Sequence, residues 1–249
     1  MGSLNKETFI CLDCETTGLD PKQDRIIELA IVKFTFSETL ETFETLIDPQ
    51  TSISEVSIAI HHITHDMVQG KPTIQEVLPE AIRIIGSHTI VGHGIQMDLS
   101  FLAEAAKRYG LQNPFISQSF IDTLRLARLY GESPTNSLEK LREHFNIQAE
   151  GAHRAMGDVV VNIAVFKYLT ASFKTIEQVH ERLSKPILLK RMPLGKHKGR
   201  PFNEIPIEYL RWALRGDFDQ DLIFSLRSEL QKRGRGGRFE QASNPFAQL

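Results

Sequence analysis

The 249-residue sequence predicts an α/β fold, a mixed sheet flanked by helices, followed by a small basic, helix-rich appendage. Strand-forming runs come first, as an N-terminal meander over residues 9–15, 26–34 and 40–47. From residue 74 onward, helical apolar periods alternate with short strands. Beyond Pro186 the charge balance changes sign, which marks off the appendage.

The first strand ends in two acids, Asp13 and Glu15, just before a turn marked by Gly18 and Pro21. Side chains at positions i and i+2 share one face of a strand, so both carboxylates should point the same way. Two adjacent anions directed into one site usually need a cation. By itself the pair also fits a polar strand end that meets solvent. The cation-site interpretation therefore needs further ligands elsewhere in the chain.

The later elements follow from apolar periodicity and from turn residues. Thr73 precedes a helical period over 74–85, which Pro79 should kink and Gly86 should end. Short strands are expected at 88–91 and 120–121, and further helices at 98–106, 124–130, 138–145 with Asn136 as its cap, 155–168, 175–183, 207–215 and 220–232.

Composition limits the classes of function. With 41% hydrophobic and 24% charged residues the chain resembles ordinary soluble proteins. No apolar run approaches the roughly 18 residues that span a bilayer, and the first residues lack a signal peptide, so we expect a cytoplasmic protein with no membrane partner. Cys11 and Cys14 cannot build a disulfide framework or a four-ligand zinc site, and we expect them to be reduced packing residues.

The net charge of −2 hides an asymmetry that suggests domain boundaries. From Pro186 to the end, 12 Lys and Arg residues face 7 Asp and Glu residues, whereas the preceding residues hold 17 and 24. We expect a main domain over 7–183, a small basic domain over 186–233 and a disordered tail over 234–249.

In the basic domain, three cations alternate along one loop: Lys196, Lys198 and Arg200. They would share one face if the loop is extended, which suits contacts to DNA phosphates without base reading. Solvated loop side chains are the alternative.

Further acids lie at the ends of later elements. Asp98 starts a helix, and His153 precedes Asp158, in the first turn of another helix, by five residues. If these segments meet, four carboxylates and one imidazole share a site, and four anions so close cannot all stay ionised without cations. Oxygen ligands without thiolates favour Mg²⁺ or Mn²⁺.

Two such ions about 4 Å apart are the arrangement that holds the attacking and leaving oxygens of a phosphoryl displacement. We therefore expect two Mg²⁺ or Mn²⁺ ions and a phosphodiester substrate. His153 would be the general base, because an imidazole can accept the proton of a metal-activated water near neutral pH.

These residues resemble the DEDDh branch of the DnaQ-like 3′–5′ exonucleases. The resemblance implies an RNase-H-like fold and the removal of nucleotides from 3′ ends with two Mg²⁺ or Mn²⁺ ions. The stretch Asp13–Thr17 is more similar to the proofreading branch, that of the DNA polymerase III epsilon subunits, than to the RNA-trimming branch. The segments that match in order, over about residues 7–171, are Asp13-x-Glu15, Arg25–Leu29, Ile60–Thr64, Gly92–Asp98, Asp122–Leu124, Asn136–Leu138 and His153-x4-Asp158.

The resemblance implies roles by position. Asp13, Glu15 and Asp158 would ligate metal directly, and Asp98 would hold the second ion. The residues implied to contact the substrate are Thr16, Leu19, His62, Ile63 and His93.

Among these contacts, Thr16 would meet the terminal 3′-hydroxyl through its backbone, while Leu19 and Ile63 would form walls for the last base. For His93 a structural role is favoured over contact with the substrate. Relatives often carry Asn after the histidine of the second motif, and Gly94 in this chain removes that polar contact but no metal ligand. Asp122 precedes a helix and fits a cap better than a ligand.

The implied activity is a metal-dependent 3′–5′ exodeoxyribonuclease in proofreading during DNA replication or in DNA repair. Two alternatives remain: an exoribonuclease that trims RNA ends, and a non-catalytic nucleic-acid-binding accessory protein. The segment Met192–Leu214 resembles a small domain of unknown function that is sometimes fused to such exonucleases. Gln241–Phe246 weakly resembles a sliding-clamp-binding peptide, so the candidate partners besides DNA are a DNA polymerase and a sliding clamp.

Overall fold

The computed structural model describes residues 3–111, 113–115, 117–130, 136–148 and 154–242, with the side chains of 235–242 left out. The chain divides into two compact units, Met1–Arg182 (unit 1) and Leu183–Leu249 (unit 2). Within the described ranges, no helix is both long and apolar enough to cross a membrane.

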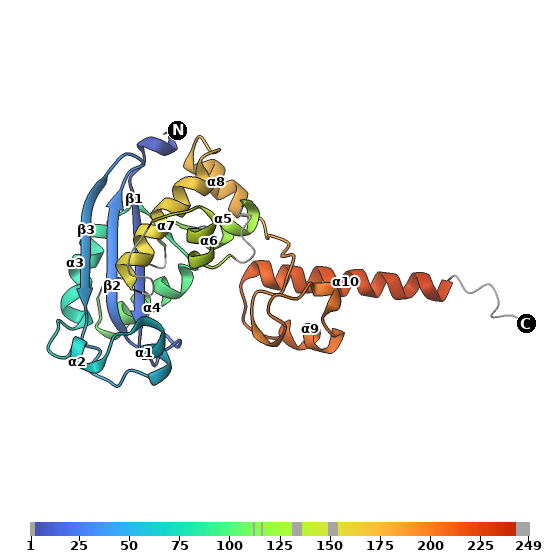
Figure 1. The fold of residues 1–249 in the computed structure, drawn as a ribbon, viewed down its shortest axis with the longest axis horizontal. Helices are drawn as coiled ribbons and strands as arrows, with labels where there is room; N and C mark the ends of the chain where they lie inside the picture. Colours follow the sequence, from blue (N-terminus) through green and yellow to red (C-terminus); the bar gives the residue numbers. More distant parts are fainter. Residues whose placement is uncertain (1–2, 112, 116, 131–135, 149–153, 243–249) are drawn as a thin grey trace, which may run out of the picture. The chain divides into compact units, whose positions relative to one another are not determined.

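Unit 1 is built on a five-stranded sheet in the order β3-β2-β1-β4-β5 (Figure 1). β2 runs antiparallel to both β1 and β3, whereas β4 is parallel to β1 and β5 is parallel to β4. The predicted mixed sheet that opens with a meander is therefore confirmed. The strands are β1 (Phe9–Thr16), β2 (Ile26–Phe34), β3 (Thr39–Leu46), β4 (Thr89–Gly92) and β5 (Phe120–Asp122).

The helices follow the predicted order, with two differences. Two short helices, α1 and α2, lie around His62, where no helix was predicted. The cap of α6 is Ser137 rather than Asn136, because the Ser137 hydroxyl accepts the Lys140 N–H. The helices up to residue 183 are α1 (Glu55–His61), α2 (His65–Val68), α3 (Ile74–Ile85), α4 (Gln96–Arg108), α5 (Thr123–Tyr130), α6 (Leu138–His144), α7 (Ala155–Thr170) and α8 (Ile176–Leu183).

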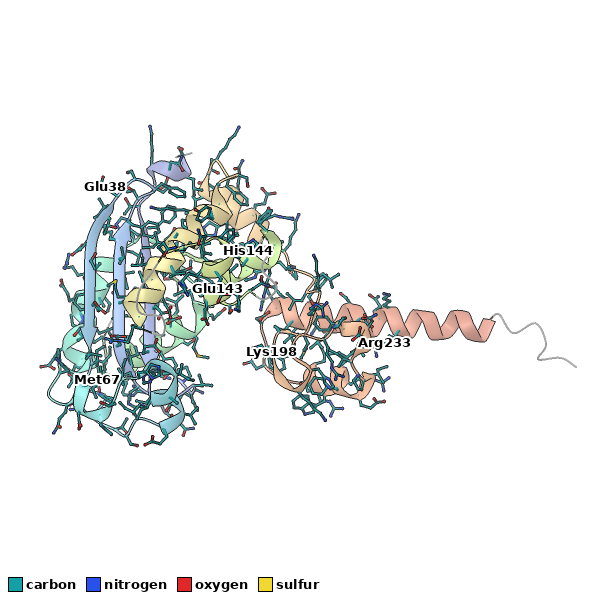
Figure 2. The ribbon with its side chains drawn as sticks, in the orientation of Figure 1. Glu38, Met67, Glu143, His144, Lys198 and Arg233 are labelled. Carbon is teal, nitrogen blue, oxygen red and sulfur yellow. The ribbon has the colours of Figure 1, made fainter. Side chains whose placement is uncertain are left out.

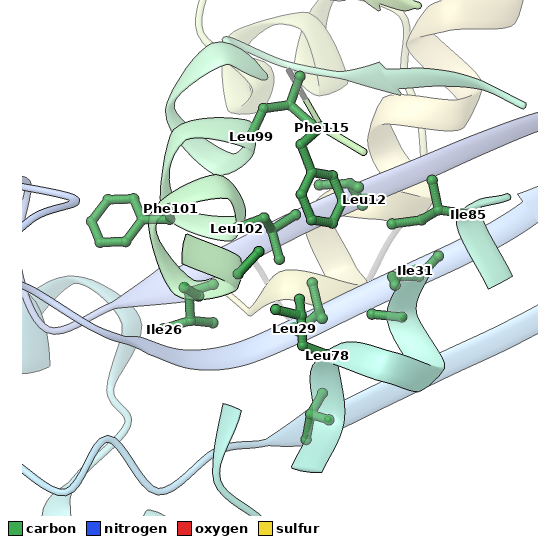
Figure 3. Packing of buried hydrophobic residues seen from close by; sticks show 14 of the residues in the cluster. Leu12, Ile26, Leu29, Ile31, Leu78, Ile85, Leu99, Phe101, Leu102 and Phe115 are labelled. Atoms are coloured by element: carbon green, nitrogen blue, oxygen red, sulfur yellow. The ribbon is translucent and has the colours of Figure 1, made fainter. Parts of the chain in front are cut away.

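Alternation along β1 divides its side chains between two layers. Ile10 and Leu12 pack with the apolar side chains of α3 and α4 on one face of the sheet (Figure 3). Phe9 points to the other face, where its ring centroid lies 5.1 Å from that of Phe166 in α7. Because side chains two residues apart share a face, Asp13 falls on the α7 side of the sheet.

A buried ion pair ties β2 to the start of α7. Glu28 is fully buried within a strand that is apolar apart from it and the half-buried Lys33. Its carboxylate accepts hydrogen bonds from Arg154 Nε at 3.0 and 3.1 Å and from the Ala155 N–H at 3.0 Å. The contact satisfies both the buried carboxylate and an amide of the first turn of α7, and so holds the beginning of that helix against the sheet.

Unit 2 packs around a small core of its own, which includes Met192, Phe202, Ile205, Leu210, Leu222 and Leu226. Its helices are α9 (Ile207–Ala213) and α10 (Gln220–Ala242). The expected disordered tail is wrong for residues 234–242, which continue α10, because glycines lower helix propensity without blocking the backbone hydrogen bonds. Residues 243–249, with most of the clamp-peptide resemblance, lie outside the described residues.

Arg154→Ala should destabilise unit 1 markedly, because it leaves the buried Glu28 carboxylate without its guanidinium partner. We expect a loss of about 2 kcal/mol, below the about 3–5 kcal/mol typical of a broken buried pair because Arg154 is partly in water. Arg83→Ala is the matched control, since Arg83 binds two glutamates at the surface and should change little. Urea denaturation of both variants measures the difference in the free energy of unfolding. Equal losses of free energy in the two variants would show that the Glu28–Arg154 contact stabilises the fold no more than a surface ion pair.

Candidate active site

Three carboxylates meet at the end of β1. Oxygen atoms of Asp13, Glu15 and Asp158 lie within 4.8 Å of one another, and all three side chains are half-buried. Strand alternation places the first two on the α7 face, as the sequence predicted, while Asp158 comes from the first turn of α7. The positive end of the α7 dipole favours a carboxylate at that position.

Local register makes room for this group. Ala30 of β2 stands directly opposite Asp13, and Glu28 stands opposite Glu15. The small Ala30 side chain leaves space beside the Asp13 carboxyl group. Glu28 is paired with Arg154, but its negative charge still contributes to raising the pKa of Glu15.

Asp98 approaches the group from α4, on a separate segment. Its Oδ1 accepts the Cys14 N–H at 2.9 Å, which ties α4 to β1 beside the acids. The tight group excludes Asp98, but its charge contributes to raising the pKa of Asp13. Three of the four acids are therefore close together with the fourth nearby on α4, and the division of metal ligation among them stays a prediction.

Burial and mutual repulsion oppose ionisation of these acids. Burial raises the pKa of Asp13 well above its usual value, and the nearby carboxylates of Asp98 and Asp158 add to the effect. Burial also raises the pKa of Glu15 to about 8, with Asp158 as the next contributor, and that of Asp98 to about 7. A divalent cation would reverse this, because it favours the charged form of every carboxylate around it. The oxygen-only donor set therefore fits a hard divalent metal.

The remaining predicted contacts differ in accessibility. Leu19 is 82% exposed in the turn after β1, and His62 is exposed at the end of α1 with φ of 60°. The Thr16 hydroxyl donates to the Gly18 carbonyl at 2.6 Å, which shapes that turn. His153 lies outside the described residues, so its predicted role as general base stays a prediction.

The predicted contact of Ile63 with the substrate is contradicted. Ile63 is fully buried and packs with Ile27, Ile53 and Val68, so its side chain belongs to the core and is not a wall for a base. The error arose because sequence pattern cannot tell an apolar wall from a core residue under a short loop.

His93 has structural partners, in line with the role that the sequence favoured for it over a substrate contact. Its Nε2 lies 2.9 Å from the Asn136 carbonyl, to which it must donate, and its Nδ1 lies 3.1 Å from the Thr123 hydroxyl. Burial lowers the pKa of His93 to about 4, so the ring is neutral near pH 7. With both ring nitrogens engaged, His93 joins β4 to later segments.

Other polar groups near the acids also have structural roles. Asp122 accepts the N–H groups of Gly94 and Leu124, each at 2.9 Å, and so acts as the predicted cap. Both cysteines are free of disulfide bonds, and burial raises the pKa of each thiol well above its usual value, which keeps them unreactive.

The pairing of Glu28 with Arg154 was not predicted from the sequence. A lone acid inside a mostly apolar strand does, however, signal a buried charge that needs a partner.

Glu15→Gln should change how the stability of the metal-free protein depends on pH. Folding raises the pKa of Glu15 from 4.5 to about 8. Between those values the folded protein binds more protons than the unfolded chain, so its stability falls as pH rises through this window. Glutamine removes the ionisation. In EDTA the melting temperature of the variant should therefore equal that of the parent near pH 4.5. Near pH 8 the variant should have the higher melting temperature.

Added Mg²⁺ or Mn²⁺ should reverse the order at the higher pH, because only the parent keeps the charged ligand. Glu38→Gln, an exposed glutamate before β3, is the control (Figure 2). Melting temperatures by calorimetry measure the effect. A variant that follows the parent at every pH would show that the Glu15 charge does not destabilise the metal-free site.

Comparison with known families gives two matches along the chain. Residues 10–166 match the family model described as Exonuclease (RNase_T). Residues 180–225 match a second model, whose description names a quorum-sensing-regulated virulence factor.

Curated relatives include replicative DNA polymerase components. The chain is 32% identical over 197 residues to the PolC-type DNA polymerase III of Clostridium perfringens, a match that covers 76% of this chain and 13% of that protein. It is 34% identical over 163 residues to DNA polymerase III subunit epsilon of Aquifex aeolicus, covering 64% of this chain and 78% of that protein. The chain thus spans about an eighth of the PolC-type relatives and most of the epsilon subunit.

Solved structures show the same architecture. Exonuclease X in complex with 5′ overhanging duplex DNA matches with a TM-score of 0.55 and 29% identity, covering 70% of this chain and 98% of that chain. Escherichia coli exonuclease I in complex with a dA16 oligonucleotide matches with a TM-score of 0.63 and 20% identity, covering 72% and 43%. These matches confirm the predicted RNase-H-like fold. Because the Exonuclease model spans more than half of the chain, and the chain covers more than three quarters of the epsilon subunit, this protein belongs to the exonuclease family.

Proposed function

We propose that this chain hydrolyses phosphodiester bonds at DNA 3′ ends and releases 5′-mononucleotides. The observation that carries the proposal is the group of Asp13, Glu15 and Asp158, whose oxygen atoms lie within 4.8 Å of one another at the end of the central strand β1. Such a group is unfavourable for stability without a cation, and phosphodiester hydrolysis is a reaction that paired divalent ions accelerate.

The residues have distinct tasks in this proposal. Asp13, Glu15 and Asp158 would hold Mg²⁺ or Mn²⁺ directly, and Asp98 would help to hold the second ion. When bound, the two ions would neutralise charge that develops on the phosphate during the displacement. His153 would accept the proton of the attacking water. The turn after β1 would receive the 3′ terminus, through the backbone of Thr16 and the exposed Leu19.

DNA is the favoured substrate because the relatives are DNA enzymes. Exonuclease X and exonuclease I were both solved with DNA, and the other relatives are named DNA polymerase III subunit epsilon and PolC-type DNA polymerase III. We extend this to a cytoplasmic role in proofreading or repair, with a DNA polymerase or a sliding clamp as candidate partners. An RNA-trimming activity is the alternative, since the acids do not distinguish the two sugars.

Asp13→Asn and Asp158→Asn should each abolish the release of nucleotides. Each substitution keeps the shape of the side chain but removes a charged metal ligand. We expect a loss of at least about 1000-fold in rate, because metal ions supply several kcal/mol of transition-state stabilisation. Glu38→Gln is the matched control and should leave the rate unchanged. Release of mononucleotides from a 3′-labelled strand with Mg²⁺, with Mn²⁺ and with EDTA measures the effect.

Retained activity in both Asn variants would overturn the site assignment. Failure of the parent protein to turn over any substrate with either metal would instead favour the non-catalytic accessory protein.

Matched DNA and RNA oligonucleotides should separate the two substrate readings. A 5′-labelled DNA strand should yield a ladder that shortens from its 3′ end, and an RNA strand of the same sequence should be degraded more slowly. A 3′-phosphate on the DNA should block the reaction if the turn after β1 receives a free hydroxyl. Faster degradation of RNA would replace the DNA proposal, and shortening from the 5′ end would contradict the polarity.

A further inference from the structure

An exposed aromatic ring stands on the surface of unit 2. Trp212, the only tryptophan of the chain, lies in α9 and is 61% exposed. Tryptophan is highly buried on average, so such exposure of its large apolar ring is uncommon. An exposed aromatic ring is a natural stacking surface for a planar ligand.

The ring is held in place by its neighbours. Its centroid lies 5.2 Å from that of Tyr209, one turn earlier in α9, and the Tyr209 centroid lies 4.5 Å from that of His197 in the preceding loop. Gly195 of the same loop has φ of +73°, and a Cβ atom there would lie 2.6 Å from the Tyr209 hydroxyl oxygen. The loop and α9 therefore lie in close contact, and Tyr209 supports Trp212 from one side.

The loop beside these rings is strongly basic. Its residues 190–200 include no Asp or Glu, and the five cations among them are all exposed: Lys190, Arg191, Lys196, Lys198 (Figure 2) and Arg200. Backbone hydrogen bonds join the two ends of the loop, from the Met192 N–H to the Arg200 carbonyl at 2.9 Å and from the Gly199 N–H to the Met192 carbonyl at 2.8 Å. The loop thus gathers five positive charges into a short hairpin-like segment.

These cations have no acidic partner in the parts of the chain that the structure describes. Lys196 and Lys198 are exposed chain neighbours of His197, whose buried ring packs against Tyr209, so the backbone of both lysines lies close to the rings of α9. In α9, Glu208 is exposed as well, but Arg211 and the following Arg215 outweigh its charge. A partner with many negative charges complements this surface.

We propose that unit 2 binds single-stranded DNA on this surface, with an unpaired base stacked on Trp212 and the neighbouring phosphates at Lys196 and Lys198. The proposal rests on the proposed function for its choice of DNA as the polyanion. Every base has a face that can stack on an aromatic ring, and lysines contact phosphates without reading sequence. The combination of an exposed ring with adjacent cations is how proteins bind single strands without sequence preference.

Trp212 fluorescence reports on this surface directly, because the chain has no other tryptophan. In the full chain with EDTA, which prevents hydrolysis, addition of oligo(dT) should change the emission of Trp212 in a saturable manner. A blunt duplex of the same length should change it much less, because its bases are already stacked. The measurement requires no catalysis, so it succeeds or fails independently of the proposed exonuclease activity.

Substitutions should separate stacking from charge. Trp212→Ala should weaken binding of labelled oligo(dT) about tenfold, and Trp212→Phe should recover most of the loss. Tyr168→Ala removes another exposed aromatic, in unit 1, and should leave binding unchanged. Fluorescence anisotropy measures all three affinities.

The double variant Lys196→Gln/Lys198→Gln should weaken binding and lower the slope of log K against log salt by about 1.4, since each phosphate contact on a single strand contributes about 0.7. Lys6→Gln/Lys174→Gln has the same net charge but removes cations near the start of β1, the end opposite the acids, and should keep the parent slope.

Unchanged Trp212 emission at saturating oligo(dT) would overturn the proposal, and so would an equal response to the duplex. Equal salt slopes for the two double variants would also overturn it, because the lysines of the loop would then contribute no more than lysines elsewhere.

Discussion

The fold must hold several carboxylates at the end of the central strand of its sheet, against their mutual repulsion and the cost of burying them. Asp13, Glu15 and Asp158 come from two elements that are far apart in sequence and lie within 4.8 Å of one another. The burial that raises the pKa of Asp13 is the same burial that lets the carboxylates act strongly on a metal, since a low local dielectric strengthens every charge interaction. Part of the stability of the apolar core is therefore offset at the site, a trade common in enzymes.

Two packing features keep this unfavourable group in place. On one face of the sheet, Ile10 and Leu12 bury themselves against α3 and α4, and a slip of one residue in β1 would turn them to the other face and the acids into the core. On the other face, the contact of Glu28 with Arg154 and the Ala155 N–H holds the first turn of α7 against β2. Asp158 lies in that turn, so its position depends on a contact that takes no part in chemistry.

The two units separate different physical tasks. Unit 1 brings several half-buried carboxylates together, which suits the binding of metal ions. Unit 2 presents exposed cations and an aromatic ring over a small apolar core. This combination suits the binding of a nucleic acid without recognition of its sequence. If the carboxylates and the cations shared one surface, they would pair with each other. Because they belong to separate units, each group can bind its own ligand.

The sequence by itself determined everything that depends on local periodicity. Patterns within short segments were enough to predict four features: the shared face of Asp13 and Glu15, the apolar meander, the helix that carries Asp158 and the cap formed by Asp122. Tertiary structure alone decided what depends on distant neighbours: that Ile63 is core, that both nitrogens of His93 are engaged, that Glu28 pairs with Arg154, and that Tyr209 supports an exposed Trp212. The extension of α10 through residues 234–242 also escaped prediction, because glycine-rich sequence lowers helix propensity without forbidding a helix. The physical reason is common to these cases, since periodicity shows which way a side chain points and only packing shows what it meets.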